Sequence, residues 1–266
     1  MLFSEDQLQR YSRHMILPGV GAEGQEKLLK AKVLVVGVGG LGSPAGYYLA
    51  AAGIGDLVIV DNDVVELSNL QRQIAHSTTK IGMPKVVSAK DTFEALNPDT
   101  KVTAIRERIT RSNISGLISD CDIVVDCSDN FATRFLINDA CVLSKKRFVS
   151  GAILRFEGQL TTILPGEGHC YRCLFEEMPP ADIVNSLQTA GLVGAVPGVI
   201  GTLQALEVIK LIVGIGNVLK ERLLVFDGLK TKFRRIKVQR NPECPVCGDD
   251  PTITSLNDRD YSAYRF

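Results

Sequence analysis

A cluster of glycines and a few charged side chains could hold and activate a nucleotide. Gly37, Gly39 and Gly42 follow the apolar run KVLVV in the pattern G-x-G-x-x-G. This pattern makes a tight turn that lets a phosphate approach the backbone at the start of a helix, where free N–H groups favour an anion. Asp61 ends the next apolar run, LVIVD, where an acid accepts a ribose hydroxyl in nucleotide-binding folds. These residues predict a nucleotide site.

Two cations and one carboxylate indicate what happens to that nucleotide. Arg72 and Lys85 follow Asp61, and Asp129 follows a later apolar run. Lys85 stands at an expected helix start, where a cation is favourable only if an anion binds beside it. Nucleotidyl transfer needs cations and a Mg²⁺-holding carboxylate around the phosphates, whereas hydride transfer does not. The sequence has no G-x-x-x-x-G-K-[ST], so a P-loop NTPase is excluded.

Asp129 and Asn130 sit between the run DIVVD and a helical pattern. Ligands of open parallel sheets bind at the carboxyl ends of the strands, which favours a functional role for Asp129. The local sequence equally allows either residue to be only the cap of the following helix. Both interpretations stay open at this point.

Two Cys-x-x-Cys pairs, Cys170/Cys173 and Cys244/Cys247, provide four soft ligands. They fit a closed, tetrahedral, structural zinc site that would tie two distant parts of the chain together. A redox pair and unliganded thiols are the alternatives, but neither pair has the βαβ context of a redox motif. The three remaining cysteines lie in apolar surroundings and are expected to be core residues: Cys121, Cys127 and Cys141.

The overall composition limits the possible partners. The 266 residues include 30 basic and 30 acidic side chains, so bulk charge does not indicate nucleic-acid binding. The charged N-terminus lacks an apolar run, which predicts a cytoplasmic protein. The apolar stretch from Gly194 to Gly216 holds Gln204, Glu207 and Lys210 on one face, which predicts a buried amphipathic helix and no membrane span.

Strand and helix patterns alternate through the first half of the chain, which predicts an α/β fold. We expect a Rossmann-like, mostly parallel sheet flanked by helices, continued by an antiparallel C-terminal half with the structural zinc site formed by the four paired cysteines. Strands are expected at 32–36, 57–61, 102–105, 122–126, 148–153, 158–164, 223–227 and 231–238. Helices are expected from a Ser4 cap through Arg13, after Gly42, after Asn130, and at 22–29, 85–96, 112–118 and 199–213.

We expect three parts along the chain. Residues 1–30 form a helical arm, residues 31–248 the main domain, and residues 249–266 a loose polar tail. The main domain would consist of a nucleotide-binding half at about 31–153 and a second half with the zinc site at about 154–248.

The chain resembles the MoeB/ThiF family, the bacterial relatives of ubiquitin-activating enzymes, from about Asp6 to Gly248. The glycine motif alone would be weak evidence, but many blocks agree in order. They are RYSRHMIL, VLVVGVGGLGSP, DNDVVELSNLQRQ, GMPKV, DCSDN, EGQLT, CYRC, GVIGTLQALEVIK and NPECPVC.

The resemblance implies an ATP-dependent adenylyltransferase. Its substrate would be the C-terminal glycine carboxylate of a small ubiquitin-like sulfur carrier of the MoaD/ThiS type, ending in Gly-Gly. Pyrophosphate would be released, and sulfur would come from a separate donor in molybdenum cofactor biosynthesis, thiamine biosynthesis or another sulfur-transfer route. The resemblance makes residues 31–248 the adenylation domain, whose half at about 154–248 would bind the carrier. Adenylation of another carboxylate is the alternative, followed by an NAD- or FAD-dependent oxidoreductase or a non-catalytic adaptor.

The resemblance also implies roles for single residues. Gly40 would belong to the nucleotide loop, Asp61 would bind ribose, and the segment SNLQR would line the nucleotide: Ser68, Asn69, Leu70, Gln71 and Arg72. Arg72 and Lys85 would contact phosphates, and Asp129 would position Mg²⁺ with Asn130 beside it. Four residues match the family's zinc ligands: Cys170, Cys173, Cys244 and Cys247.

Arg13 of RYSRH resembles an arginine that reaches into the partner subunit's ATP site, which implies a catalytic homodimer. One position departs from the family pattern. Many members have a cysteine four residues before the position of Gly191, where this chain has Leu187. Leucine cannot form a thioester, so we expect adenylation without a covalent carrier intermediate. No rhodanese-like extension follows Gly248, so the sulfur donor is expected to be a separate protein.

Overall fold

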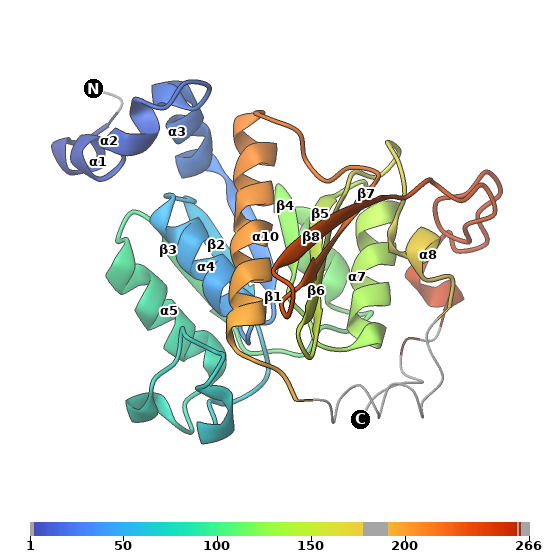
Figure 1. Cartoon of the computed structure of the whole chain (residues 1–266), viewed down its shortest axis with the longest axis horizontal. Coiled ribbons are helices and arrows are strands. Elements are labelled where there is room, and N and C mark those ends of the chain that lie inside the picture. Colours follow the sequence, from blue (N-terminus) through green and yellow to red (C-terminus); the bar gives the residue numbers. More distant parts are fainter. Residues whose placement is uncertain (1–2, 178–190, 260, 262–266) are drawn as a thin grey trace.

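An eight-stranded mixed sheet, in the order β3-β2-β1-β4-β5-β6-β7-β8, organises the molecule (Figure 1). The computed structural model describes residues 3–177, 191–259 and 261. Its helices are α1 (Glu5–Arg10), α2 (Ser12–Met15), α3 (Gly21–Lys30), α4 (Gly42–Ala51), α5 (Lys85–Leu96), α6 (Ile114–Ser119), α7 (Phe131–Leu143), α8 (Tyr171–Leu174) and α10 (Ala195–Val213). Its strands are β1 (Lys32–Val36), β2 (Asp56–Val60), β3 (Lys101–Ile105), β4 (Ile123–Asp126), β5 (Arg147–Leu154), β6 (Glu157–Ile163), β7 (Arg222–Asp227) and β8 (Lys232–Lys237).

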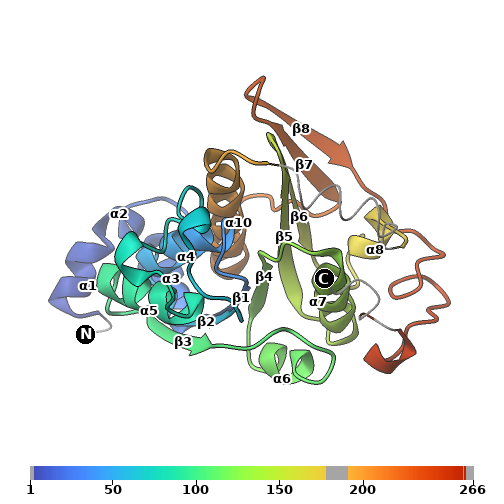
Figure 2. The same ribbon diagram turned by 90° about the horizontal axis from the view of Figure 1, so that it is seen from below.

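The first five strands are parallel, and β1, β2 and β4 are buried on both faces. In β1, Val33 and Val35 belong to the core cluster beneath α4, α5 and α10, whereas Leu34 and Val36 belong to the cluster beneath α6 and α7. Figure 2 shows these two helix layers on opposite sides of the sheet. A strand covered on both faces needs apolar side chains at every position, which explains the continuous Val/Ile/Leu runs.

The C-terminal half continues the same sheet with antiparallel strands. β5 pairs with β6 over seven positions, and β7 and β8 extend the sheet to an edge. All six residues of β8 are exposed, and four of them are Lys or Arg, a composition that discourages pairing with other sheet edges. The predicted fold class is confirmed. Strand pairing continues through Ile153 and Leu154, the expected border between the two halves of the domain. The division into two halves stays a prediction.

Helix α10 is a core helix whose polar stripe faces the sheet. Within the described residues it alone is long and apolar enough to cross a membrane, and half of its apolar window is buried. Gln204 Nε2 donates to Asp126 O at 2.7 Å, and the Leu219 N–H donates to Glu207 Oε2 at 2.7 Å. These inward bonds explain why a helix with a buried face carries charged residues. Its outer face exposes Leu206, which is 48% accessible.

The N-terminal arm differs from the single helix that we expected through Arg13. The Ser4–Gln7 capping box is present, but the helix is interrupted at Tyr11, where α1 ends and α2 follows. The Tyr11 ring is buried, and its hydroxyl donates to Asp99 Oδ2 at 3.0 Å and accepts from Asn97 Nδ2 at 2.8 Å. Tertiary anchoring of this tyrosine therefore bends the chain.

The C-terminal segment also differs from expectation. We expected residues after Gly248 to be loose, but Ile253 and Tyr261 are 1% and 7% exposed. Both belong to the apolar cluster around α7. Single apolar residues among polar neighbours give no periodic signal, so the sequence pattern did not reveal this docking.

Candidate active site

A cavity lies where the order in which the parallel strands are added reverses, beside β1 and β4. β1 leads to β2 and β3 on one side, whereas β4 and β5 lie on its other side. Ligands of such sheets bind at this point, outside the carboxyl ends of the strands. A cavity of about 880 Å³ lies there, which is within the usual range for ligand pockets, roughly 300–1,000 Å³. It is lined by the loops that follow β1, β2, β3 and β4, and by residues from α7 and the β5–β6 turn.

Two glycines of the loop are required by the backbone geometry, and a third leaves open space at the cavity. Gly37 has φ +87°, and a Cβ on Gly42 would lie 1.9 Å from the Gly37 carbonyl oxygen. These two glycines are therefore needed for the turn and for the close packing of α4. A Cβ on Gly39 would meet nothing closer than Gln73 Nε2 at 3.5 Å, and the residue lines the cavity. Its open space suits the close approach of a phosphate.

Gly40 also lines the cavity, beside the first turn of α10. A Cβ on Gly40 would lie 3.3 Å from Pro197 Cβ and 3.7 Å from Arg72 Cδ. The glycine loop, α10 and the Arg72 segment therefore meet at this point, which suits a binding loop held on several sides.

Asp61 lies on the cavity wall with its carboxylate fixed by two backbone groups. The N–H groups of Val38 and Asp63 donate to its two oxygens at 3.0 and 2.9 Å. Burial raises the pKa of Asp61 above its usual value, and these two bonds and Lys85 oppose that rise. A held carboxylate at the end of β2 has lone pairs left for ribose hydroxyls.

The two predicted phosphate-binding cations both reach the cavity. Lys85 is 6% exposed, and its Nζ donates to Asp63 Oδ2 at 2.9 Å. Arg72 Nη1 donates to Ser68 O at 3.0 Å. Asp63, which the sequence did not single out, is thus the structural partner of Lys85. Two cations that line one cavity favour a polyphosphate ligand.

Asn130 acts as the cap of the following helix, whereas Asp129 lies at the cavity. Asn130 is the N-cap of α7, and its Oδ1 accepts from the Thr133 N–H at 2.9 Å. Asp129 is exposed on the cavity rim, where Asn130 Nδ2 donates to its Oδ1 at 3.4 Å. A carboxylate in this position suits a hard cation such as Mg²⁺, which binds through one or two carboxylates and the substrate phosphates.

A buried charge network supports this rim. Asp126 accepts from the Ser128 and Ser150 hydroxyls at 2.6 and 2.8 Å. Arg134 pairs with Asp126 at 3.8 Å and also donates to the carbonyl oxygens of Gly151 and Ser128. Sequence reasoning missed this pair because each residue looks like ordinary strand or helix sequence.

The SNLQR segment contributes unevenly to the cavity. Arg72 lines it, whereas Ser68, Asn69, Leu70 and Gln71 do not. Asn69 instead caps the short helical turn at Leu67–Asn69 by accepting from the Glu66 N–H at 3.3 Å. Contacts of these four residues with a nucleotide stay a prediction.

Gln73, directly after that segment, lines the cavity and is buried. Its Oε1 has no hydrogen-bond partner among the described residues.

Arg13 lies apart from the cavity in its own chain. It is exposed on α2, and the arm that carries it joins the amino end of the sheet, where the Gly55 N–H donates to Leu28 O at 3.1 Å. Figures 1 and 2 show α1–α3 together at one end of the molecule. Leu187, the position that departs from the family pattern, lies outside the described residues.

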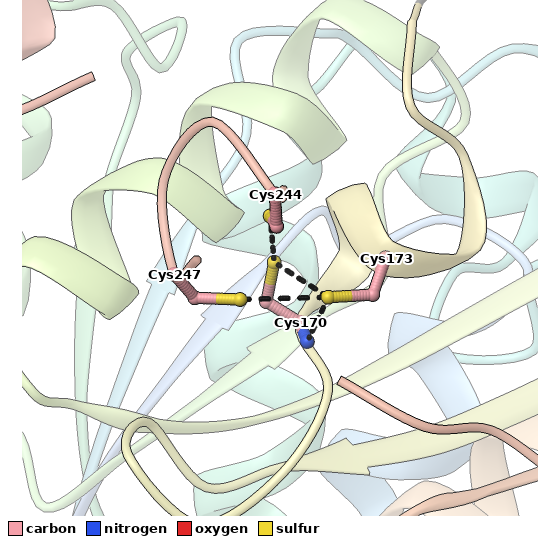
Figure 3. Close-up of side chains that lie close together, drawn as sticks. All are labelled: Cys170, Cys173, Cys244 and Cys247. Atoms are coloured by element: carbon pink, nitrogen blue, oxygen red, sulfur yellow. Dashed lines mark hydrogen bonds between the residues drawn. The ribbon is translucent and has the colours of Figure 1, made fainter. Parts of the chain in front are cut away.

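The two Cys-x-x-Cys pairs come together as one cluster (Figure 3). The Sγ atom of Cys170 lies 3.9 Å from that of Cys173 and 3.6 Å from that of Cys244, and those of Cys173 and Cys247 are 3.4 Å apart. Four sulfurs about 2.3 Å from a tetrahedral zinc are separated by about 3.8 Å, whereas a disulfide is about 2.05 Å long. The donor set and spacing fit zinc.

The three other cysteines are core residues, as predicted. Cys121, Cys127 and Cys141 are all buried. Burial raises the pKa of the Cys127 and Cys141 thiols above their usual value and that of Cys121 to about 11. Protonated buried thiols are poor nucleophiles.

Comparison with known proteins shows the family of the chain. The sequence model of the ThiF family matches residues 11–246. A Haloferax volcanii protein named SAMP-activating enzyme E1 is 48% identical over 255 residues, covering 96% of this chain and 94% of its own. A Thermus thermophilus protein named sulfur carrier protein adenylyltransferase is 48% identical over 269 residues, covering 99% and 98%.

Longer and more distant relatives share the same region. The pig adenylyltransferase and sulfurtransferase MOCS3 is 47% identical over 96% of this chain, which covers 56% of MOCS3. Escherichia coli MccB, solved with ATP, superposes with a TM-score of 0.81 at 27% identity over 93% of this chain and 75% of MccB. The family match spans most of the chain and agrees with the geometry of the site, so this protein belongs to the ThiF family.

Proposed function

We propose that this protein uses ATP to adenylate the C-terminal glycine carboxylate of a small ubiquitin-like sulfur carrier. The observation that carries the proposal is the convergence of the glycine loop, Asp61, Arg72, Lys85 and Asp129 on one cavity at the carboxyl edge of the sheet. The curated relatives reported above are named as an adenylyltransferase, an adenylyltransferase and sulfurtransferase, and an E1 activating enzyme.

The reaction joins two anions. A carboxylate oxygen of the carrier attacks the α-phosphorus of ATP, the bond from this phosphorus to the bridging oxygen breaks, and pyrophosphate leaves with that electron pair. Charge grows on the β- and γ-phosphates as this bond breaks. Fixed cations that face the growing charge lower the barrier more than they stabilise the bound substrate.

The residues of the cavity fit this requirement. Arg72 and Lys85 would neutralise the phosphates, Asp61 would hold the ribose, and the open backbone at Gly39 would admit the phosphates. Asp129 would hold Mg²⁺, which would supply positive charge to offset part of the negative charge of the phosphates. Asn130 would keep Asp129 at the rim by fixing the first turn of α7.

In a homodimer, Arg13 of one subunit would supply a third cation to the ATP site of the other. Arg13 does not line the cavity of its own chain, so a contact between Arg13 and ATP would have to occur in a second subunit's site. Exposed apolar side chains on the arm, α4 and α10 offer a surface for such contact: Ile16, Leu17, Tyr48 and Leu206. The four-cysteine cluster, with zinc, would be structural.

The later steps involve other proteins. Sulfur would be delivered by a separate donor to the acyl-adenylate, and we propose that no covalent carrier intermediate forms at Leu187. The cytoplasmic location and the specific biosynthetic pathway remain predictions.

Pyrophosphate exchange into ATP tests the proposed function. Exchange should require a ubiquitin-fold protein ending in Gly-Gly and should stop when that protein lacks its terminal glycines. Asp129→Ala should lower the exchange rate by about 10²–10³-fold, by analogy with lost transition-state stabilisation. Carrier-independent exchange, or full exchange by Asp129→Ala, would contradict the proposal.

A second candidate is adenylation of a free peptide carboxylate. The microcin C7 biosynthetic enzyme MccB, solved in complex with N-formylated MccA, superposes with a TM-score of 0.83 at 26% identity. The 48% identity to the Thermus sulfur carrier protein adenylyltransferase favours the carrier instead. Exchange supported by short peptides without any carrier would favour the peptide.

A further inference from the structure

One wall of the cavity is apolar and is built from three distant segments. Ile109 from the loop after β3, Leu136 from α7 and Tyr261 from the C-terminal segment all line the cavity. The three side chains belong to one buried cluster and are 8%, 3% and 7% exposed. An apolar wall facing an otherwise polar cavity needs a ligand part with apolar faces.

The Tyr261 ring is held in place by a buried ion pair. Its hydroxyl donates to Asp139 Oδ2 at 2.6 Å, and the Arg172 guanidinium donates to both Asp139 oxygens at 2.7 Å. Arg172 also lies over the Phe135 ring, 4.6 Å from its centre. The ring is therefore preorganised before any ligand binds, which lowers the entropy cost of binding.

Arg172 lies between Cys170 and Cys173 in the chain. The ion pair that holds Tyr261 is therefore attached directly to the cysteine cluster. The cluster, α7 and the C-terminal segment thus form one continuous support behind the apolar wall. A buried ion pair alone gives little net stabilisation. The Arg172–Asp139 pair instead fixes the position of the Tyr261 ring.

We propose that Tyr261 is a nucleobase-binding residue contributed by the C-terminal segment. The inference rests on the proposed use of ATP, whose purine is its one large apolar part. Gly39, Arg72 and Lys85 mark the phosphate end and Asp61 the ribose, so the base reaches the wall of Ile109, Leu136 and Tyr261. An aromatic ring there gives the base a flat contact surface.

Equilibrium nucleotide binding by the intact protein tests this role. Tyr261→Leu keeps the apolar volume but removes the ring. It should raise the Kd of both AMP and ATP by about three- to tenfold, from the usual strength of an aromatic pair. The KM of pyrophosphate in the exchange reaction should stay unchanged, because pyrophosphate has no base.

Phe148→Leu is the matched control. Phe148 is a buried aromatic residue of the same cluster on β5, and it does not line the cavity. This variant should leave AMP and ATP affinity unchanged. Equal loss in both variants, a raised pyrophosphate KM in Tyr261→Leu, or unchanged AMP affinity would overturn the inference. Failure of the wild-type protein to bind ATP would instead overturn the proposed function.

Discussion

Lys85 shows how one residue can serve both the fold and the chemistry. Its side chain is nearly buried at the start of α5, yet it lines the cavity and is paired with the more exposed Asp63. A cation at a helix N-terminus is unfavourable by itself. Asp63 offsets this cost in the free protein and holds the ammonium group in place for an incoming phosphate.

Substitutions at this pair should separate structural from catalytic effects. Lys85→Ala removes charge stabilisation in the transition state, so the exchange rate should fall by about 10²–10³-fold. Asp63→Asn keeps Lys85 and should have a much smaller effect on that rate. The initial rate of pyrophosphate exchange at saturating ATP measures both.

Lys80→Ala is the control for loss of a nearby positive charge. Lys80 Nζ donates to Ser88 O at 2.9 Å on the adjoining segment, and Lys80 does not line the cavity. Its exchange rate should match that of the wild type. An equal fall for Lys80→Ala and Lys85→Ala would mean that Lys85 acts only through general electrostatics.

At the scale of elements, the glycine loop depends on a histidine that lies behind it. His76 Nε2 lies 3.0 Å from Val38 O, and Nδ1 lies 2.9 Å from Ser88 Oγ of α5. Burial lowers the pKa of His76 to about 4, and Lys80 and Lys85 act in the same direction. The neutral imidazole thus links the nucleotide loop to α5.

This linkage predicts a pH dependence of stability. The folded pKa of His76 is about 4 and the unfolded value is about 6.5, so the unfolded chain binds the extra proton between these values. The free energy of unfolding should therefore fall as pH drops from about 6.5 to 4, by up to about 1.4 kcal/mol per pH unit from this group.

Urea unfolding of His76→Gln at several pH values checks this expectation. The variant should show a shallower dependence on pH between about 4 and 6.5, because glutamine does not titrate. The same slope in the wild type and the variant would show that His76 does not titrate on unfolding.

The sequence predicted most elements because their signals are local. Continuous apolar runs locate β1, β2 and β4, and the glycine turn locates the start of α4, since buried parallel strands and tight turns restrict residue type. Asp61, Arg72, Lys85 and Asp129 could be placed near one cavity because strand ends meet at one edge of a parallel sheet.

The unpredicted features depend on contacts between distant residues. Asp63 gains its role from Lys85, and Arg134 from Asp126 and two carbonyl groups. Tyr261 is buried only because α7 and Arg172 provide a place for it. Such partners are separated by long stretches of chain, and no local pattern records the pairing.

At the scale of the whole molecule, the four-cysteine cluster joins the loop after β6 to the loop after β8. We expect one zinc ion per chain in metal analysis of the purified protein. Cys173→Ser should lose the zinc and lower Tm, by about 2–4 °C for each kcal/mol of zinc-binding free energy lost in a chain of this size. Cys141→Ala, outside the cluster, should keep its zinc. Zinc retained in Cys173→Ser would contradict the assignment.

The dimer makes a second prediction at this scale. Arg13→Ala and Lys85→Ala homodimers should both be inactive, but a mixed dimer holds one site with both groups intact if Arg13 acts across subunits. Random mixing should then restore about a quarter of the wild-type exchange rate. No restoration after confirmed subunit exchange would show that Arg13 does not act in the partner's site.

The central claim is that the α-phosphate of ATP moves to the carrier carboxylate. The most direct measurement is incubation of the protein and a Gly-Gly-terminated carrier with ATP labelled at either the α- or the γ-phosphate. The account predicts carrier-bound label from α-labelled ATP only, with the γ-label recovered in pyrophosphate. Carrier-bound γ-label, or no carrier-bound label from either substrate, would contradict it.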